Sequence, residues 1–149
     1  MPISIRKKVL ITLGAPALFG LGAATALALA PSISVVPLLE TTKTVVGEPI
    51  VYPTAAPAKI TATLVNLSPG ASTGWHKHGV PLVGLIMDGE LTVDYGAKGK
   101  RTFKSGEAFA EAINETHQGT NTGTDMVRLF VVYMGAEGLP TSVPEKAPE

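Results

Sequence analysis

The sequence contains no cysteine among its 149 residues, and only 5% of its residues are aromatic. Without disulfides, the folded state has to be held by its core alone. No run of basic residues exceeds the turn Lys98–Arg101, so the chain has no basic patch of the kind that binds nucleic acid. The length fits one domain, since domains of about 100–150 residues are the most common.

Charge is also lacking near the N-terminus, where the apolar stretch Val9–Ala30 follows the basic residues Arg6–Lys8. A basic segment, an apolar segment and small residues such as Ala26–Ala28 are typical of a secretory signal peptide. Pro31 would hinder cleavage directly before it, which favours a cut near Ala28. The stretch is also within the roughly 17–25 residues that span a bilayer, so an uncleaved membrane anchor is the alternative. We therefore expect export, to the periplasm or the medium, or tethering to the membrane.

The rest of the chain divides by composition. We predict a signal peptide or anchor over residues 1–30, an irregular proline-rich arm over 31–58, a β-barrel over 59–138 and a flexible tail over 139–149. After residue 30 the chain has nine Lys or Arg against twelve Asp or Glu, a net charge of about −3 with neutral histidines.

No segment after residue 40 sustains the 3.6-residue period of an amphipathic helix. Residues 59–67 and 126–134 are rich in β-branched and apolar residues, as strands are. Residues 83–87 and 90–95 flank Asp88-Gly89, a two-residue signature of a β-hairpin. Many short strands at a spacing of about 8–12 residues predict an all-β sandwich or barrel.

Two of the three histidines, His76 and His78, lie two positions apart in the stretch GWHKHGVPLVG. Alternate side chains of a strand share a face, so both rings point the same way and can coordinate one metal ion. His117 would complete a set of three. The alternative is that His76 and His78 are surface residues beside a turn and that His117 is an ordinary loop histidine.

The spacing around these histidines is specific. The first set of anchors consists of Gly70, His76, His78 and Gly89, and the second of Gly106, His117 and Asn121. Over residues 60–135 these offsets resemble the two motifs of the cupins, in particular the small single-domain (type-2) cupins. Two departures stand out: Leu82 occupies the position of the glutamate in the first motif, and Ala112 and Asn114 replace the usual proline and glycine of the second.

The resemblance implies a single jelly-roll β-barrel whose mouth holds a divalent transition metal, Fe, Mn, Cu, Zn or Ni, on three histidines and one carboxylate. It also implies a small-molecule ligand or substrate and makes a homodimer an expectation. Cupin functions range from oxygenases and isomerases to storage and ligand-sensing proteins, so the fold does not fix the activity.

Three arrangements could account for a site that has Leu82 in place of the usual glutamate. The metal could be held by His76, His78 and His117 alone, with water or substrate completing the shell. A carboxylate could come from elsewhere, and Glu111 is the candidate because strand alternation places it on the same face as Phe109. Glu111 on the outer face is the alternative. Third, the site could have lost its metal and bind ligands by shape.

We favour the three histidines with Glu111 as a fourth ligand or as the catalytic acid and base. Two classes of function follow. The first is an exported metalloenzyme that acts on a small molecule, by oxygenase or hydroxide-based chemistry. The second is a non-catalytic module that binds a small ligand. Asn121, next to the second motif, is expected to fix a turn rather than to contact a ligand.

Overall fold

The structure is a computed structural model that describes residues 33–149, of which Val35–Glu149 form one unit. The expected signal peptide or anchor, with its N-terminal helix, lies outside the described residues. Within residues 33–149, no helix is long and apolar enough to cross a bilayer.

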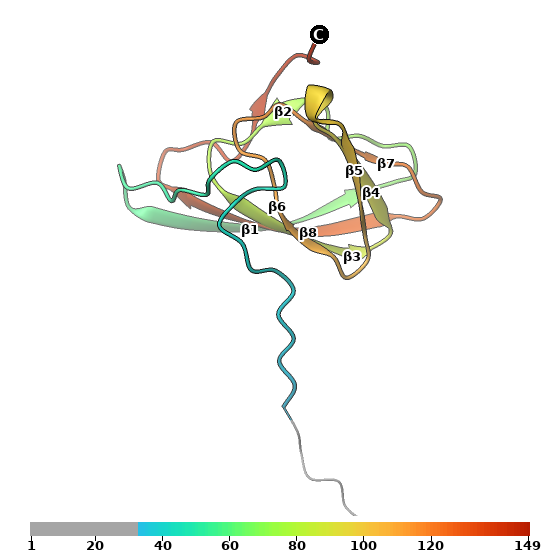
Figure 1. The fold of residues 1–149 in the computed structure, drawn as a ribbon, viewed down its shortest axis with the longest axis horizontal. Coiled ribbons are helices and arrows are strands. Elements are labelled where there is room, and N and C mark those ends of the chain that lie inside the picture. Colours follow the sequence, from blue (N-terminus) through green and yellow to red (C-terminus); the bar gives the residue numbers. More distant parts are fainter. Residues whose placement is uncertain (1–32) are drawn as a thin grey trace, which may run out of the picture. The chain divides into compact units, whose positions relative to one another are not determined.

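Antiparallel strands make up almost all of the regular structure, which confirms the all-β prediction. The elements are β1 Ala58–Leu67, β2 His76–Lys77, β3 Leu82–Asp88, β4 Glu90–Asp94, the 3₁₀ turn η1 Gly96–Lys98, β5 Lys100–Lys104, β6 Ala108–Ala110, β7 Gln118–Asn121, β8 Val127–Ala136 and β9 Val143–Pro144. A four-stranded sheet has the order β1-β8-β3-β6, a three-stranded sheet the order β5-β4-β7, and β2 pairs with β9 (Figure 1).

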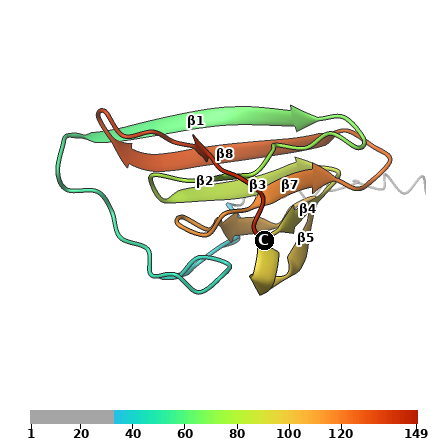
Figure 2. The ribbon, with the colours of Figure 1, turned by 90° about the horizontal axis from the view of Figure 1, so that it is seen from above.

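The two larger sheets face each other as the layers of a jelly roll (Figure 2). Their inner faces supply the core, because apolar side chains recur at every second position of the strands. On β8, Val127, Leu129 and Val131 are buried, whereas Arg128 and Phe130 are exposed. The core therefore lies between the two sheets and extends to the residues beside the histidines.

Gly89 forms the turn between β3 and β4, but the β-hairpin predicted at Asp88-Gly89 is wrong. Strand β3 pairs with β6 and β8, whereas β4 pairs with β5 and β7 in the other sheet. Gly89 has a φ of +81°, and a Cβ there would lie 2.8 Å from the carbonyl oxygen of Met126. Both the backbone conformation and the lack of space require glycine at this turn. The turn carries the chain from the four-stranded sheet to the three-stranded sheet.

Both ends of the described unit lie against the loops that carry the histidines. In the proline-rich arm, the amide of Val45 donates to the carbonyl oxygen of Ala110 at 2.8 Å. The Glu48 carboxylate accepts from the amides of Ile113 and Asn114, at 2.7 and 2.9 Å. These hydrogen bonds lower the pKa of Glu48, although its partial burial acts to raise it. The arm thus fixes the loop that precedes His117.

The end of the chain, over residues 139–149, includes a short strand that lies beside the histidines. Strand β9 pairs with β2, with His76 opposite Pro144 and Lys77 opposite Val143. Lys77 also forms an ion pair with Glu145 at 2.6 Å. The two-residue strand is too short to show a periodic pattern, and its order comes from the open edge of β2, which lies far away in sequence.

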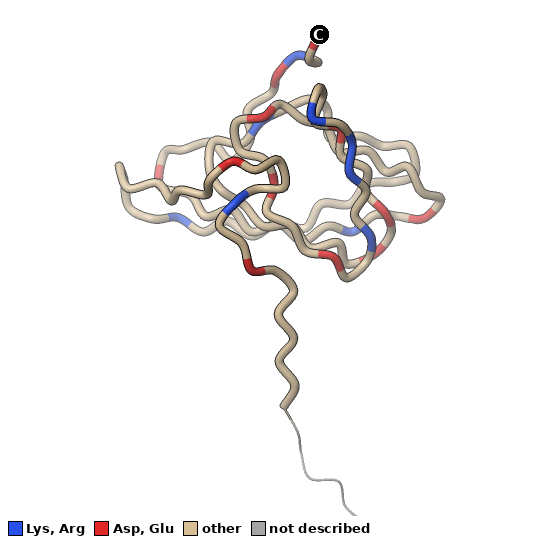
Figure 3. Tube along the Cα trace, viewed as in Figure 1, with Lys and Arg blue, Asp and Glu red and all other residues tan. Residues whose placement is uncertain are grey.

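Charged residues of both signs are spread over the described unit (Figure 3). Several form pairs across neighbouring strands or loops, such as Lys100 with Asp94 at 2.8 Å and Lys98 with Glu115 at 2.9 Å. These pairs are solvent-exposed, and pairs of this kind contribute about 0–1 kcal/mol each.

Candidate metal centre

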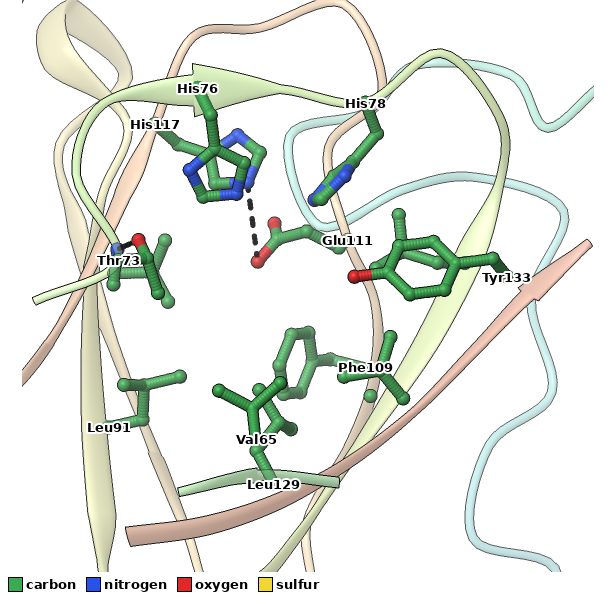
Figure 4. A pocket seen from close by; sticks show the side chains of 15 residues that line it. Val65, Thr73, His76, His78, Leu91, Phe109, Glu111, His117, Leu129 and Tyr133 are labelled. Atoms are coloured by element: carbon green, nitrogen blue, oxygen red, sulfur yellow. Dashed lines mark hydrogen bonds and ion pairs between the residues drawn. The ribbon is translucent and has the colours of Figure 1, made fainter. Parts of the chain in front are cut away.

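The three histidines converge at one end of the barrel (Figure 4). His76 begins β2, His78 follows it, and His117 directly precedes β7. The backbones of His76 and His117 exchange two hydrogen bonds, of 2.9 and 2.8 Å, which bring the two motifs together. The ring centroids are 4.5–5.1 Å apart, and one nitrogen from each ring lies within 4.8 Å of the other two. The three side chains can therefore hold a metal ion.

Each ring has its Nδ1 atom hydrogen-bonded to a backbone carbonyl oxygen. The partner is Gly74 for His76 at 2.9 Å, Thr141 for His78 at 2.7 Å and Glu115 for His117 at 2.8 Å. A carbonyl oxygen only accepts, so Nδ1 must carry the proton in every ring. The Nε2 lone pairs are then available for a metal, as is usual for ligating histidines.

Burial keeps the three rings neutral. It lowers the pKa of His78 to about 3, and it also lowers the pKa of His76 and of His117, while the bonds from Nδ1 to carbonyl oxygens oppose the shift. Metal ligation requires neutral imidazole, and at neutral pH these rings are already in that form.

His117 provides the test of whether a metal fits. Its side chain is 1% exposed, and its Nε2 atom has no hydrogen-bond partner within residues 33–149. A buried polar atom without a partner is unfavourable by about 1–3 kcal/mol. A metal ion between the three Nε2 atoms would remove that penalty, so the residues present fit the ion that the motif implies.

Glu111 directly follows β6 and points toward the histidines, as the strand alternation predicts (Figure 4). It is 6% exposed. Its Oε1 accepts hydrogen bonds from the Tyr95 hydroxyl and from the Ala112 amide, both at 2.7 Å. Its Oε2 lies 3.9 Å from Nε2 of His117, which is too long for a hydrogen bond, and with His117 neutral the contact is not an ion pair.

In this position the Glu111 carboxyl group is close to the point between its protonated and its ionised form at neutral pH. Burial raises its pKa to about 7, against the opposing effect of the hydrogen bonds from Tyr95 and Ala112. A carboxyl group that titrates near neutral pH can hold or release a proton under working conditions. A metal at the histidines would favour the ionised form.

Leu82, where the first motif has its glutamate, is buried and lines the same cavity. The amide of Glu111 donates to the carbonyl oxygen of Leu82 at 3.3 Å, so the two residues face each other on neighbouring strands. Val83 and Leu85 point away from the cavity, while Gly84 lines it. The carboxylate that the first motif has on β3 is therefore replaced by that of Glu111, which lies opposite Leu82 and directly follows β6.

The structure adds residues that the sequence did not single out. Tyr95 is fully buried and holds Glu111, and Tyr133 packs against His78 with ring centroids 5.8 Å apart. Tyr95 directly follows β4 and Tyr133 lies in the apolar strand β8, and neither position has a local sequence signal. Asn121 behaves as expected: its amide donates to the carbonyl oxygens of Leu67 and Asp125, and its Oδ1 accepts from Gly123.

The fold and the site together define a jelly-roll protein with a three-histidine centre that can hold a metal. The cupin-domain family model matches residues 63–133, which include all three histidines. Residues 63–133 are therefore a cupin domain of the small type-2 kind.

Solved structures show the same fold at low sequence identity. An oxalate oxidase is 24% identical with a TM-score of 0.50, and the match covers 57% of this chain and 45% of that one. An oxalate decarboxylase from Lactobacillus farciminis is 21% identical (TM-score 0.48; 57% and 26% covered). A cupin-superfamily sugar phosphate isomerase from Silicibacter pomeroyi is 24% identical (TM-score 0.45; 50% and 50% covered).

The chain thus spans half or less of the length of these three proteins. A search of curated protein sequences found no match. At this level of identity the structural likeness establishes the fold only, and the substrate has to be argued from the site.

Proposed function

We propose that this cupin is an exported metalloenzyme that binds a divalent transition metal through His76, His78, His117 and Glu111 and acts on a small molecule. The observation that carries the proposal is the buried Nε2 of His117, which has no partner within residues 33–149 and faces Oε2 of Glu111 at 3.9 Å. Two other neutral imidazoles lie within 4.8 Å. Export rests on residues 1–30, outside the described residues.

Each residue has a separate task. The three histidines supply neutral Nε2 donors that their Nδ1 hydrogen bonds already orient. Tyr95 and Ala112 hold Oε1 of Glu111, which leaves Oε2 to complete the metal shell or to take a proton from the substrate and return it. A bound divalent ion would supply a Lewis acid, and also a redox centre if it is iron, copper or manganese.

The first experiment measures the metal content of the protein, purified without chelators and without a histidine tag. The variant is His76→Ala and the matched control is Lys77→Ala, the next residue of β2, which pairs with Glu145 instead. We expect about one equivalent of metal in the wild type and in Lys77→Ala, and none in His76→Ala. Metal near zero in the wild type even after reconstitution would overturn the proposal and leave a barrel that binds ligands without an ion.

A further inference from the structure

Behind the histidines the barrel encloses a cavity of about 70 Å³. Its far end, opposite the histidine rings, is formed by Val65, Leu91, Phe109 and Leu129 (Figure 4). The side-chain polar atoms on its wall belong to the three histidines, Glu111, Thr73 and Tyr133. The cavity is therefore polar at one end and apolar at the other.

The polar atoms that are available to a ligand lie at the histidine end, where the Tyr133 ring packs beside His78. The Thr73 hydroxyl donates to the carbonyl oxygen of Gly74 and accepts from the amide of Gly119, both at 3.0 Å. Oε1 of Glu111 already accepts two hydrogen bonds. A hydroxyl or second carboxylate placed among Leu91, Phe109 and Leu129 would have no partner, and burying it unpaired is unfavourable.

Charge restricts the ligand further. Three neutral histidines leave the charge of a divalent ion at +2, and Glu111 can offset at most one unit of it. No Lys or Arg lines the cavity, so a second negative charge at the apolar end would meet no cation. One negative charge at the histidine end is compensated, whereas two separated charges are not.

Size sets the length of the ligand. A cavity of about 150 Å³ accommodates benzene, which has six non-hydrogen atoms. A cavity of about 70 Å³ encloses about half as many non-hydrogen atoms. The end of the ligand that binds the metal can extend to the open side of the cavity, where Thr73 is exposed.

We propose that the site takes short aliphatic monocarboxylates of about four or five non-hydrogen atoms, with the carboxylate at the histidines and the alkyl group against Leu91, Phe109 and Leu129. This inference rests on the proposed metal site and deepens it. It sets the protein apart from a dicarboxylate-binding cupin, because the far end of its cavity offers no partner for a second carboxylate.

The test compares the binding of propionate and glycolate to the metal-loaded protein by calorimetry. The two anions have the same number of non-hydrogen atoms and differ by a methyl group against a hydroxyl. We expect propionate to bind at least about tenfold more tightly, because the hydroxyl would be buried without a partner. We also expect the affinity to be lower for valerate than for propionate, because the longer chain exceeds the cavity.

Glycolate binding as tightly as propionate would overturn the inference. If the protein takes up metal but shows no such selectivity, only the ligand class is wrong. If it takes up no metal, the proposed function has failed as well.

A second variant tests the position of the alkyl group. Leu129→Ala enlarges the apolar end and should move the preferred chain toward butyrate or valerate. Phe130→Ala, the next residue of β8, removes a side chain on the outer face of the sheet and should leave the preference at propionate. An unchanged preference in folded Leu129→Ala would contradict the assigned orientation, and the comparison in the wild type does not depend on this variant.

Discussion

Leu82 and Glu111 face each other on neighbouring strands, joined by a hydrogen bond of 3.3 Å from the amide of Glu111 to the carbonyl oxygen of Leu82. Both side chains line the cavity beside the histidines. The first cupin motif has a carboxylate at the position of Leu82. This chain has it directly across the strand pair, at Glu111, so an acid at either position can point toward the same ion.

This relationship predicts that the two positions can be exchanged. Glu111→Leu should weaken metal binding by at least about tenfold, since even outer partners of metal ligands contribute about 10–100-fold in affinity. The double variant Leu82→Glu/Glu111→Leu should recover most of that loss, because the two residues are similar in size and their positions adjoin. Metal titrations of the three proteins test it, and a double variant no better than Glu111→Leu would contradict the exchange.

A second prediction concerns the stability of the metal-free protein. Burial raises the pKa of Glu111 to about 7 from a usual value of 4.5. The folded state therefore binds this proton more tightly than the unfolded state, and its stabilising effect is present below about pH 4.5 and is lost as the pH rises through 7. Glu111→Gln lacks this dependence and keeps an oxygen to accept from Tyr95 and Ala112.

The free energy of unfolding of Glu111→Gln relative to wild type should thus rise by about 3 kcal/mol between pH 4 and pH 8. The histidines are buried in both proteins, and their lowered pKa means that both proteins lose stability as the pH falls below about 6.5. Urea denaturation in the presence of a chelator measures the difference. A constant difference across this range would show that Glu111 is not held as described.

The end of the chain positions His78. The carbonyl oxygen of Thr141 accepts from Nδ1 of His78 at 2.7 Å, and β9 pairs with β2. A protein that ends at Gly138 loses both contacts and should bind metal about 10–100-fold more weakly. A protein that ends at Lys146 keeps them and is the matched control.

Nitrogen NMR of the metal-free proteins distinguishes positioning from a general loss of structure. In the wild type and the control, the proton of the His78 ring should reside on Nδ1. In the protein that ends at Gly138, a mixture of tautomers is expected while unfolding remains cooperative. Unchanged affinity and an unchanged tautomer would show that the segment after Gly138 has no part in the site.

Asn121 provides a contrasting case. Its side chain is 1% exposed and makes three hydrogen bonds to backbone groups, none of them at the histidines. Asn121→Ala leaves buried carbonyl groups without their donor and should lower the free energy of unfolding by about 2–4 kcal/mol. Metal affinity at a temperature where the variant is folded should match wild type, and a parallel loss of affinity would place Asn121 in the site.

The sequence indicated the strands and the pair His76 and His78 from local patterns, whereas His117 was added to the site by the spacing of the second cupin motif. Strand alternation placed His76 with His78 and Glu111 with Phe109. The Asp88-Gly89 signal located the turn, but local sequence could not show that the strands on either side of it belong to different sheets. The contacts of Tyr95 and Thr141 could not be read in this way. They join Glu111 and His78 to segments 16 and 63 residues away, and only the closed barrel brings them together.

The most direct test of the account is a cobalt(II) titration of wild type, Glu111→Gln and Glu107→Gln, followed by visible absorption, which reports both affinity and coordination geometry. Glu107 is exposed and accepts a hydrogen bond from the Lys104 amide, away from the histidines. We predict that Glu107→Gln reproduces the wild-type affinity and spectrum, whereas Glu111→Gln binds at least about tenfold more weakly with an altered spectrum. A Glu111→Gln titration that matches wild type in both respects would contradict the assignment of Glu111 as the carboxylate of this site.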